Sequence, residues 1–548
     1  MYEIETLFSD SSQARDRRLL WDRWLANGLH DRTTLSDAIS SAAARDPQNT
    51  IVMHSIERPG TIRLDRLYRE SEALARALSH KGLGPGDVVA VQLPNWVETL
   101  VTYAALSRIG AIFVPIVHIY GPRETNWILE ASGARAFFCP DRWGKIDYRQ
   151  RLAQMKVSRE LDVIMVGEEL PEGVSSWAEL STTSAEGAPL PLPCADDPVL
   201  IVYTSGTTSE PKGVIHTHRS LLAELRHMPH LPMGGSHVVS LQPWPAGHIG
   251  GLCAILGPIV TGCHCILMDR WDANDAATLV EKHRVTVLCG TPFHVSAMLD
   301  LKEAGDPRLE SVAEVMCGGA GVPPELIERC DASGWLAMRA YGSTEHPTAS
   351  AGTREMTLSS RVRSDGTACA STEIRIVRED GSDAGAGEPG EVWLRGPEQF
   401  LGYTNPELNR DAFAPGGWFR TGDVGILAVD GGLTITDRIK DVIIRGGENL
   451  SSLEIEDLVQ RHDAVAEAAA IGMSDDRYGE RVCIFILPVR GGRAPGVEEL
   501  VAFFQGLGVA KQKTPERVIE VDELPRTPAG KVKKDILRQR LAELDGRT

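Results

Sequence analysis

Apolar and polar positions in the N-terminal half of the chain switch repeatedly between helical and strand spacing. Leu67, Leu74 and Leu78 recur at helical intervals with charged residues between them, which predicts an amphipathic helix. The apolar runs 88–91 and 112–114 are too short for helices and predict buried strands on either side of a second helix. This alternation is typical of a parallel sheet covered by helices, so we expect an α/β fold.

The same alternation continues further along the chain. It predicts buried strands at residues 136–138, 163–166, 199–202, 265–267 and 285–288. Residues 171–193 are rich in Ser, Thr, Ala and Pro, which indicates a surface connection.

The pattern changes in the C-terminal third. Residues 374–433 alternate short apolar runs with glycine turns, which predicts a small β-rich subdomain. From residue 440 onward the chain has strand and helix patterns of its own and ends in a basic helix at 533–540. We therefore place a large domain at 1–436, a hinge at 437–440 and a smaller domain at 441–548.

Composition narrows the classes of function. The 548 residues exceed what one hydrophobic core usually serves, and the formal net charge of −18 argues against a nucleic-acid binder. No apolar run approaches the ~20 residues needed to span a bilayer, and the N-terminus lacks the pattern of a secretory signal. We expect a cytoplasmic protein without a transmembrane segment.

The cysteines fit that compartment. Ten are scattered without Cys-x-x-Cys pairs, as expected of free thiols in a reducing environment. Cys263, His264 and Cys265 resemble a metal motif, but alternate residues of a strand point to opposite faces, so we expect no metal site there.

The most informative stretch runs from Tyr203 to Gly213 and follows the buried strand at 199–202. It reads Tyr-Thr-Ser-Gly-Thr-Thr-Ser-Glu-Pro-Lys-Gly. Hydroxyl groups, the backbone N–H groups that a glycine exposes and the charge of Lys212 together suit an anion such as phosphate. The spacing differs from the usual nucleotide P-loop, because Pro211 precedes the lysine and Gly213 follows it.

Five further stretches carry residue types that suit a nucleotide. Gly318, Gly319 and Ala320 form a small-residue turn that lets a planar base approach the backbone. Tyr341 offers a stacking surface, and Glu345 a carboxylate for a magnesium ion. The other three stretches are Thr421-Gly422-Asp423, the pair of runs Asp437–Asp441 and Arg445–Asn449, and Pro525–Lys531.

In this order the motifs resemble the adenylate-forming superfamily, in its branch of AMP-dependent acyl-CoA synthetases. The resemblance extends from about Leu64 to Arg538. It implies a large N-terminal domain of two βαβ-type lobes plus a small β-barrel, followed by a smaller, mobile α+β C-terminal domain. Such enzymes use ATP to convert a carboxylic acid into acyl-AMP and pyrophosphate, and most then pass the acyl group to the thiol of coenzyme A.

The resemblance also implies a role for each motif. The β- and γ-phosphates of ATP are expected on Thr204, Ser205, Gly206, Thr207, Thr208 and Lys212. The magnesium ion is expected on Glu345, the adenine on Gly318, Gly319, Ala320 and Tyr341, and the ribose on Asp423 and Arg438. Gly342 and Thr344 are also expected to bind the nucleotide. Lys531 is expected to bridge the α-phosphate and the attacking carboxylate, for which a compact charge on a long stem is suited.

Lys440 corresponds to the family's hinge, about which the C-terminal domain rotates before the second step. That rotation brings Gly446 and Gly447 to the active site, where a side chain would obstruct the tunnel of the coenzyme A thiol. Because the chain retains both Lys531 and the two glycines, we expect both steps. Ser209 is a departure, since many relatives have glycine there.

The segment Pro243–Gly251 indicates which class of acid the protein binds. It contains no carboxylate to pair with the ammonium of an amino acid, which disfavours that substrate class. By the resemblance, His248 lies beside the substrate carboxylate; a core histidine is the alternative. We expect an acid pocket of Trp244, Gly247, Gly250, Gly251 and Cys317, widened at Gly247, where many relatives have an aromatic residue. A wide pocket suits an alicyclic, polycyclic or branched acid; a medium- or long-chain fatty acid is the alternative.

The acceptor is expected to be coenzyme A, since the chain ends shortly after Lys531 and no carrier domain follows it. A free-standing carrier protein presents the same pantetheine arm and stays an alternative. Luciferase-like oxygenation and a non-catalytic nucleotide-binding regulator are further alternatives, the second disfavoured by the presence of Lys531, Glu345 and Lys212. The sequence leaves open whether the protein is a monomer or a dimer.

Overall fold

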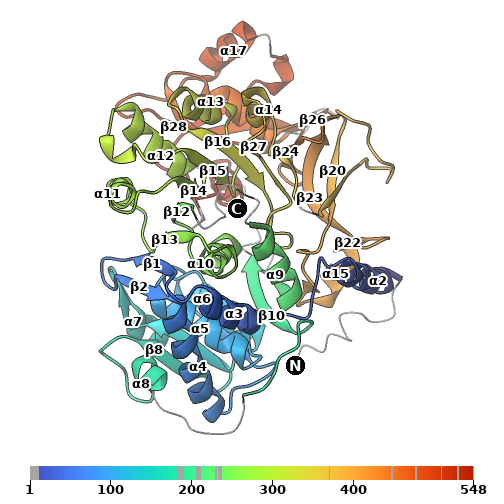
Figure 1. Cartoon of the computed structure of the whole chain (residues 1–548). Helices are drawn as coiled ribbons and strands as arrows, with labels where there is room; N and C mark the ends of the chain where they lie inside the picture. The colour runs from blue at the N-terminus through green and yellow to red at the C-terminus, as the bar shows by residue number, and fades with distance from the viewer. Residues whose placement is uncertain are drawn as a thin grey trace.

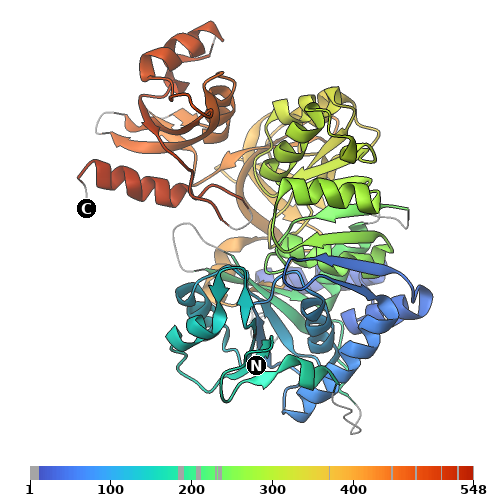
Figure 2. The same ribbon diagram turned by 90° about the vertical axis from the view of Figure 1, so that its left-hand side faces the viewer.

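The computed structural model describes residues 12–182, 190–204, 211–228, 231, 237–369, 371–445, 448–475, 478–507, 509–527 and 530–546. Figure 1 shows two lobes stacked on one another, a β-rich layer along one side, and a C-terminal domain at the opposite end from the N-terminal lobe. In Figure 2 the C-terminal domain stands beside the large domain and is joined to it by a narrow connection.

The first lobe is built on an eight-stranded sheet. Strands β10, β4, β3, β5, β8 and β9 run parallel, and β11 and β21 add an antiparallel edge. In order across the sheet the strands are β21 (Gly402–Tyr403), β11 (Lys212–Thr217), β10 (Pro198–Thr204), β4 (Ile112–Pro115), β3 (Val88–Val91), β5 (Ala136–Pro140), β8 (Asp162–Val166) and β9 (Ser175–Ser176). The runs that form this parallel sheet are almost entirely apolar because helices cover both of its faces.

The second lobe contains a nine-stranded sheet, largely parallel, with short antiparallel strands at its ends. Its strands in order are β18 (Thr367–Ala368), β17 (Ser350–Ala351), β16 (Leu336–Tyr341), β15 (Glu314–Gly318), β14 (Val287–Gly290), β12 (Val239–Gln242), β13 (His264–Met268), β1 (Thr50–His54) and β2 (Gly60–Arg63). In a parallel sheet the carboxyl ends of the strands meet along one edge, which is where ligand sites form in such folds.

A single hydrophobic core joins the two lobes, because one cluster of buried residues includes members of both sheets and of the helices between them. These helices are α3 (Leu35–Arg45), α4 (Leu64–His80), α5 (Val97–Arg108), α9 (His218–His227) and α10 (Ile249–Thr261). The outer faces are covered by α6 (Pro122–Ser132) and α7 (Tyr148–Gln154) on the first sheet, and by α11 (Ala273–His283), α12 (Pro292–Glu303) and α13 (Pro324–Ala332) on the second.

The predicted β-rich subdomain is an antiparallel sheet of five strands along the side of both lobes (Figure 1). Its strands are β19 (Glu373–Val377), β20 (Pro389–Arg395), β23 (Trp418–Leu427), β22 (Phe413–Ala414) and β24 (Leu433–Arg438). Helices α2 (Ser12–Ala26), α14 (Leu358–Arg363) and α15 (Pro406–Ala412) complete the large domain.

The C-terminal domain has its own sheet and cores. The sheet consists of β26 (Glu448–Leu450), β25 (Ile443–Arg445), β28 (Gly479–Pro488), β27 (Val465–Asp475) and β29 (Arg517–Glu520), covered by α16 (Ser452–Gln460), α17 (Val497–Gly506) and α18 (Lys534–Leu544). The basic helix expected at 533–540 is α18. The fold class predicted from the sequence is confirmed.

Two details of the sequence prediction were wrong. The strand expected at 285–288 instead runs from Val287 to Gly290. Thr286 precedes this strand, and its backbone N–H donates to the carbonyl of Val239. The connection expected at 171–193 contains β9 and the short helix α8 (Trp177–Thr182). Trp177 is buried and its indole N–H donates to Thr102 at 3.0 Å, so tertiary contacts order a segment of polar composition.

All ten cysteines are free thiols, and nine of them are buried. Within the described ranges, no helix is long and apolar enough to cross a membrane. His264 is exposed whereas Cys263 and Cys265 are buried, and the described residues contain no His, Cys, Asp and Glu grouping that suits a resident metal.

Candidate active site

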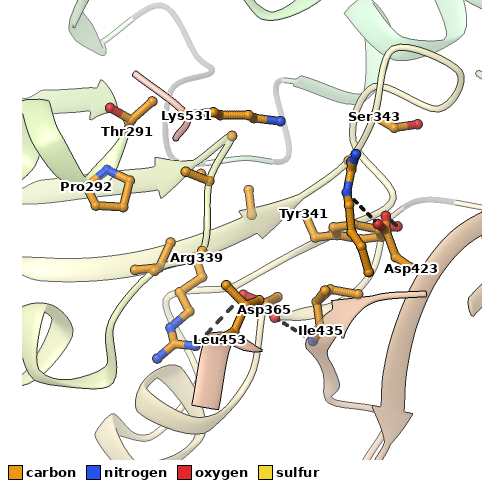
Figure 3. Close-up of a pocket in the computed structure, with 18 of the residues that line it drawn as sticks. Thr291, Pro292, Arg339, Tyr341, Ser343, Asp365, Asp423, Ile435, Leu453 and Lys531 are labelled. Atoms are coloured by element: carbon orange, nitrogen blue, oxygen red, sulfur yellow. Dashed lines mark hydrogen bonds and ion pairs between the residues drawn. The ribbon is translucent and has the colours of Figure 1, made fainter. Parts of the chain in front are cut away.

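A cleft of about 2430 Å³ lies where the two lobes, the β-rich subdomain and the C-terminal domain meet. Most of the predicted site residues that the structure describes line it, although they come from segments far apart in the chain (Figure 3). These residues are Thr204, Lys212, Trp244, His248, Gly250, Gly318, Gly319, Ala320, Tyr341, Gly342, Thr344, Glu345, Asp423, Arg438, Lys440 and Lys531. Ser205, Gly206, Thr207, Thr208, Ser209, Gly446 and Gly447 lie outside the described residues.

The predicted phosphate loop connects two strands that pair with each other. β10 ends at Thr204 and β11 begins at Lys212, and the antiparallel register places these two residues opposite one another. The ammonium of Lys212 lies 5.1 Å from the centre of the Tyr403 ring, a distance at which a cation is attracted to the ring. The two ends of the loop are therefore held at the cleft by the sheet.

Tyr403 also fixes the predicted metal ligand. Its hydroxyl donates a hydrogen bond of 2.7 Å to Oε1 of Glu345. Burial, together with the charge of Glu345, raises the pKa of Tyr403, so the hydroxyl stays protonated and remains a donor. Tyr403 was not among the predicted site residues, because nothing in its two-residue strand β21 reveals that it faces Glu345.

The predicted ribose residues form a connected group. Arg438 pairs with Asp423 at 2.9 Å, and the Tyr341 hydroxyl donates to the other oxygen of Asp423 at 2.6 Å (Figure 3). Asp423 and Arg438 are direct neighbours in the pairing of β23 with β24, whereas Tyr341 ends β16 of the other sheet. Burial, and then the charge of Asp423, raises the pKa of Tyr341, so its hydroxyl is a donor at neutral pH.

The turn after β15 is crowded against an aromatic ring. Gly319 has φ +76°, which favours glycine, and a Cβ there would lie 3.0 Å from the ring of Trp244. The same ring lies 3.8 Å from the Cβ position of Gly250 in α10. Trp244 therefore separates the Gly318–Ala320 turn from the start of α10 and forms a wall between the two parts of the cleft.

His248 is the residue that precedes α10, and it carries a polar atom without a partner. Its Nε2 atom is buried and has no hydrogen-bond partner among the described residues. Burial, and secondarily the charge of Lys531, lowers the pKa of His248 to about 4, so the imidazole is neutral at neutral pH. A buried unpaired nitrogen that lines a cleft is a natural contact for a bound polar ligand.

Lys531 reaches the cleft from the C-terminal domain. Two hydrogen bonds join the backbone of Lys531 to Thr527, and Gly530, which precedes the lysine, has φ +84°. The residue is exposed, and Figure 3 shows it in the same pocket as Tyr341 and Asp423. Desolvation in the cleft, followed by the charge of Arg438, lowers the pKa of Lys531 to about 8.

Three predicted pocket residues do not face the cleft. A side chain at Gly247 would overlap the backbone of Val117, and one at Gly251 the backbone of Pro245. Cys317 is fully buried in the core beneath α12 and α13. The expectation that Gly247 widens the pocket was therefore wrong: its small size permits close packing of two chain segments. The described wall instead includes Gly250, Cys253 and Ala254 on one face of α10.

Comparison with known proteins identifies the family. The model of the AMP-binding enzyme family matches residues 39–404, and the model of its C-terminal domain matches residues 454–531. The chain belongs to the AMP-binding enzyme family. As predicted, it is an ATP-dependent acid–thiol ligase of the adenylate-forming superfamily.

Individual relatives agree with this class. The chain is 32% identical to a medium-chain fatty-acid–CoA ligase of Escherichia coli K12, over 93% of this chain and 91% of that protein. It is 32% identical to an indoleacetate–CoA ligase of Aromatoleum aromaticum, over 86% of this chain and 91% of that protein. The solved structure of ATP-bound MatB from Rhodopseudomonas palustris superposes with a TM-score of 0.82 at 25% identity, covering 93% of this chain and all of that one.

The residues of the cleft are chemically suited to a polyphosphate and to a magnesium ion. Lys212, Arg438 and Lys531 collect positive charge in a protein whose net charge is −18, as binding of a polyphosphate requires. Glu345 offers one carboxylate, with one of its oxygens held by Tyr403. A magnesium ion usually binds through one or two carboxylates together with substrate phosphates, so this single carboxylate is chemically suited to it.

Proposed function

We propose that this ligase activates a bulky carboxylic acid, alicyclic, polycyclic or branched, and transfers the acyl group to coenzyme A. The observation that carries the proposal is the position of Lys531, which comes from the C-terminal domain and lies in one cleft with His248, Glu345 and the Asp423–Arg438 pair. This arrangement suits the first step of the reaction.

In that step a carboxylate oxygen of the acid forms a bond to the α-phosphorus of ATP while the bond to the bridging oxygen breaks and pyrophosphate leaves. Two anions approach each other, so preorganised positive charge lowers the barrier. We assign this role to Lys531, between the acid and the α-phosphate, and to Lys212 at the phosphate loop. A bound magnesium ion supplies further neutralisation of phosphate charge, and Glu345 is the residue assigned to hold it.

The nucleotide is assigned to the part of the cleft on the Tyr341 side of Trp244. Tyr341 and the Gly318–Ala320 turn provide a flat, narrow space for adenine, with Gly342 and Thr344 beside it. Asp423 accepts from ribose hydroxyls and is held in place by Arg438 and Tyr341. Thr204, Lys212 and the loop between them take the phosphates.

The acid is assigned to the other side of Trp244, with its carboxylate beside His248 and Lys531. The neutral imidazole of His248 has a buried nitrogen available for the carboxylate, and Lys531 supplies the charge. Beyond them, the α10 face of Gly250, Cys253 and Ala254 leaves room for a ring. Similarity to the indoleacetate–CoA ligase supports a cyclic acid, and similarity to the medium-chain fatty-acid–CoA ligase supports the linear alternative.

The second step requires the C-terminal domain to turn about Lys440, which lies in the tight turn after β24. We assign Gly446 and Gly447 to the tunnel for the pantetheine arm. Coenzyme A is the proposed acceptor; a free-standing carrier protein with the same arm is the alternative.

Release of pyrophosphate from ATP, measured across a panel of acids with and without coenzyme A, tests the proposal. We expect turnover with cyclic acids and formation of the acyl-CoA. Preference for long unbranched acids would refute the bulky-acid assignment, and product formation only with a carrier protein would refute coenzyme A as acceptor.

A further inference from the structure

Glu224 lies in α9 and lines the cleft, where its charge acts on Cys253 of α10. It is 2% exposed. Oxygen Oε1 accepts a hydrogen bond of 2.6 Å from the Thr348 hydroxyl. Oxygen Oε2 is buried and has no hydrogen-bond partner among the residues that the structure describes.

Besides Thr348, apolar side chains line the cleft near Glu224. Nearby lining residues include Met228, Cys253 and Ala254, and the charge of Glu224 acts on the thiol of Cys253. A buried polar oxygen without a hydrogen bond is costly in such an environment, and a leucine of similar size would pack there without that cost. The carboxyl group is therefore unexplained by packing of the protein alone.

A second buried carboxyl group increases this cost. Glu398 is 1% exposed, and its Oε1 accepts a hydrogen bond of 3.1 Å from the Thr372 hydroxyl. Its Oε2 has no hydrogen-bond partner in the described part of the chain. Within the same part, neither Glu224 nor Glu398 forms an ion pair with a Lys, Arg or His. Burial raises the pKa of Glu224 to about 7, and burial together with the charge of Glu224 raises that of Glu398 to about 8.

Helix α10 gives a measure of how far Glu224 lies from the reacting end of the acid. His248 immediately precedes the helix, and Cys253, the α10 residue close to Glu224, lies five positions later. At 1.5 Å per residue this separation is roughly 7–8 Å along the helix axis. An acid whose carboxylate lies beside His248 would therefore meet Glu224 with a group farther along α10.

We propose that Glu224 is a specificity-determining residue at the far end of the acid pocket, and that the acid carries a hydrogen-bond donor there, a hydroxyl or an amine. The proposal rests on the proposed function, since it takes the acid to lie between His248 and α9. A donor on the substrate satisfies Oε2, and the carboxyl group in turn disfavours acids that end in hydrocarbon, because those leave the oxygen unpaired.

Three acids with one scaffold test this assignment: 3-phenylpropanoic acid, its 4-hydroxyphenyl analogue and its 4-(aminomethyl)phenyl analogue. For each, kcat/KM for pyrophosphate release is measured with the wild type, Glu224→Leu and Glu224→Gln. We expect the wild type to prefer a donor-bearing acid. Glu224→Leu should lower kcat/KM for that acid roughly ten- to a hundredfold, because the buried donor of the acid is then left without an acceptor, and leave the unsubstituted acid unchanged or improved.

Glu224→Gln separates the two donors and preserves the shape of the side chain. The amide still accepts from a hydroxyl but does not pair with an ammonium, so only the aminomethyl acid should lose rate. Thr348→Val is the matched control, since it removes the partner of Oε1 and leaves Oε2 in place; it should preserve the preference.

Equal losses for all three acids in Glu224→Leu, with a stable fold by thermal melting, would overturn the inference. So would a wild type that prefers the unsubstituted acid, or one that turns over other acids but none of these three. In each of those cases acid-dependent pyrophosphate release continues, and the proposed function stands. A wild type that is inactive with every acid of the wider panel refutes the proposed function itself.

Discussion

Asp437 in β24 accepts two hydrogen bonds from Ser452, the first residue of α16: one from the side-chain hydroxyl at 3.0 Å and one from the backbone N–H. Asp437 is only 2% exposed. The ammonium of Lys534 in α18 lies 2.7 Å from the Ser452 hydroxyl and 2.7 Å from Glu456. A buried polar network thus joins the last strand of the large domain to two helices of the C-terminal domain.

This network stabilises the domain arrangement in which Lys531 lies in the cleft. Ser452→Ala removes the side-chain hydroxyl from it, and we expect acyl-AMP formation to slow roughly tenfold, since a hydrogen bond to a charged acceptor is lost. Thioester formation from preformed acyl-AMP should be unchanged or faster. Both half-reactions are measured separately. Glu499→Gln, which affects a surface ion pair with Arg493 within the C-terminal domain and lies outside the cleft, is the control; equal effects of both variants would contradict the role of the network.

Lys531→Ala should nearly abolish acyl-AMP formation and leave thioester formation from preformed acyl-AMP largely intact. The reason is that, in the proposed mechanism, the lysine supplies positive charge only where the carboxylate meets the α-phosphate. Single-turnover assays of the two half-reactions decide the matter. If the rates of both half-reactions fall by the same factor, Lys531 does not act in the first step alone.

The lowered pKa of Lys531 predicts a pH dependence. The protonated ammonium is the active form, so kcat/KM for acyl-AMP formation should fall as the pH rises through about 8, where the free enzyme loses this proton. An arginine keeps its charge at such pH values, so in Lys531→Arg the residual activity should lack this decline. A pH profile of kcat/KM from 6 to 10 for both proteins makes the comparison, and an identical decline in both would point to another group.

Glu345→Gln keeps the size of the side chain and removes its charge. We expect slower acyl-AMP formation and a higher magnesium concentration for half-maximal rate, because a neutral amide is a weaker magnesium ligand than a carboxylate. Magnesium titrations at saturating ATP measure this shift. Glu355→Gln, at an exposed position outside the cleft, is the control. An unchanged magnesium dependence in Glu345→Gln would remove Glu345 from the metal site.

Two glycines close together in sequence should respond oppositely to substitution. Gly247→Ala places a methyl group against the backbone of Val117, and overpacking of this kind typically costs ~1–3 kcal/mol, so the melting temperature should drop. A Cβ at Gly250 meets only the Trp244 ring, at the ordinary contact distance of 3.8 Å, so Gly250→Leu should leave the melting temperature unchanged or raised, since leucine favours a helix.

Gly250→Leu should also change which acids the pocket accepts. Gly250→Leu is expected to lower kcat/KM for cyclic acids roughly tenfold or more while sparing hexanoate, because a slim chain passes the added side chain. Rates with a cyclohexane acid and with hexanoate measure the selectivity. Equal losses for both acids would show that Gly250 does not border the space that a ring occupies.

The sequence by itself determined the elements and the reaction class. Buried strands such as Val88–Val91 and Asp162–Val166 were predictable from their apolar runs. A continuous apolar run is stable in a strand only where both faces of the sheet are covered by helices. The position of Thr204, Lys212 and Lys531 at the cleft agrees with the prediction, because each lies in a short motif whose residue types are recognisable within a few positions of the chain. Their roles in binding phosphate stay predictions.

Only the tertiary structure decided which residues meet. Glu345 and Tyr403 are 58 positions apart, Glu224 and Thr348 are 124 apart, and no local pattern in the sequence relates them. Gly247 was misassigned for the same reason: the sequence shows that the residue is small, but only the approach of Val117 reveals that the missing side chain makes room for backbone. Local patterns report that a residue is buried, whereas its partner depends on how distant segments pack.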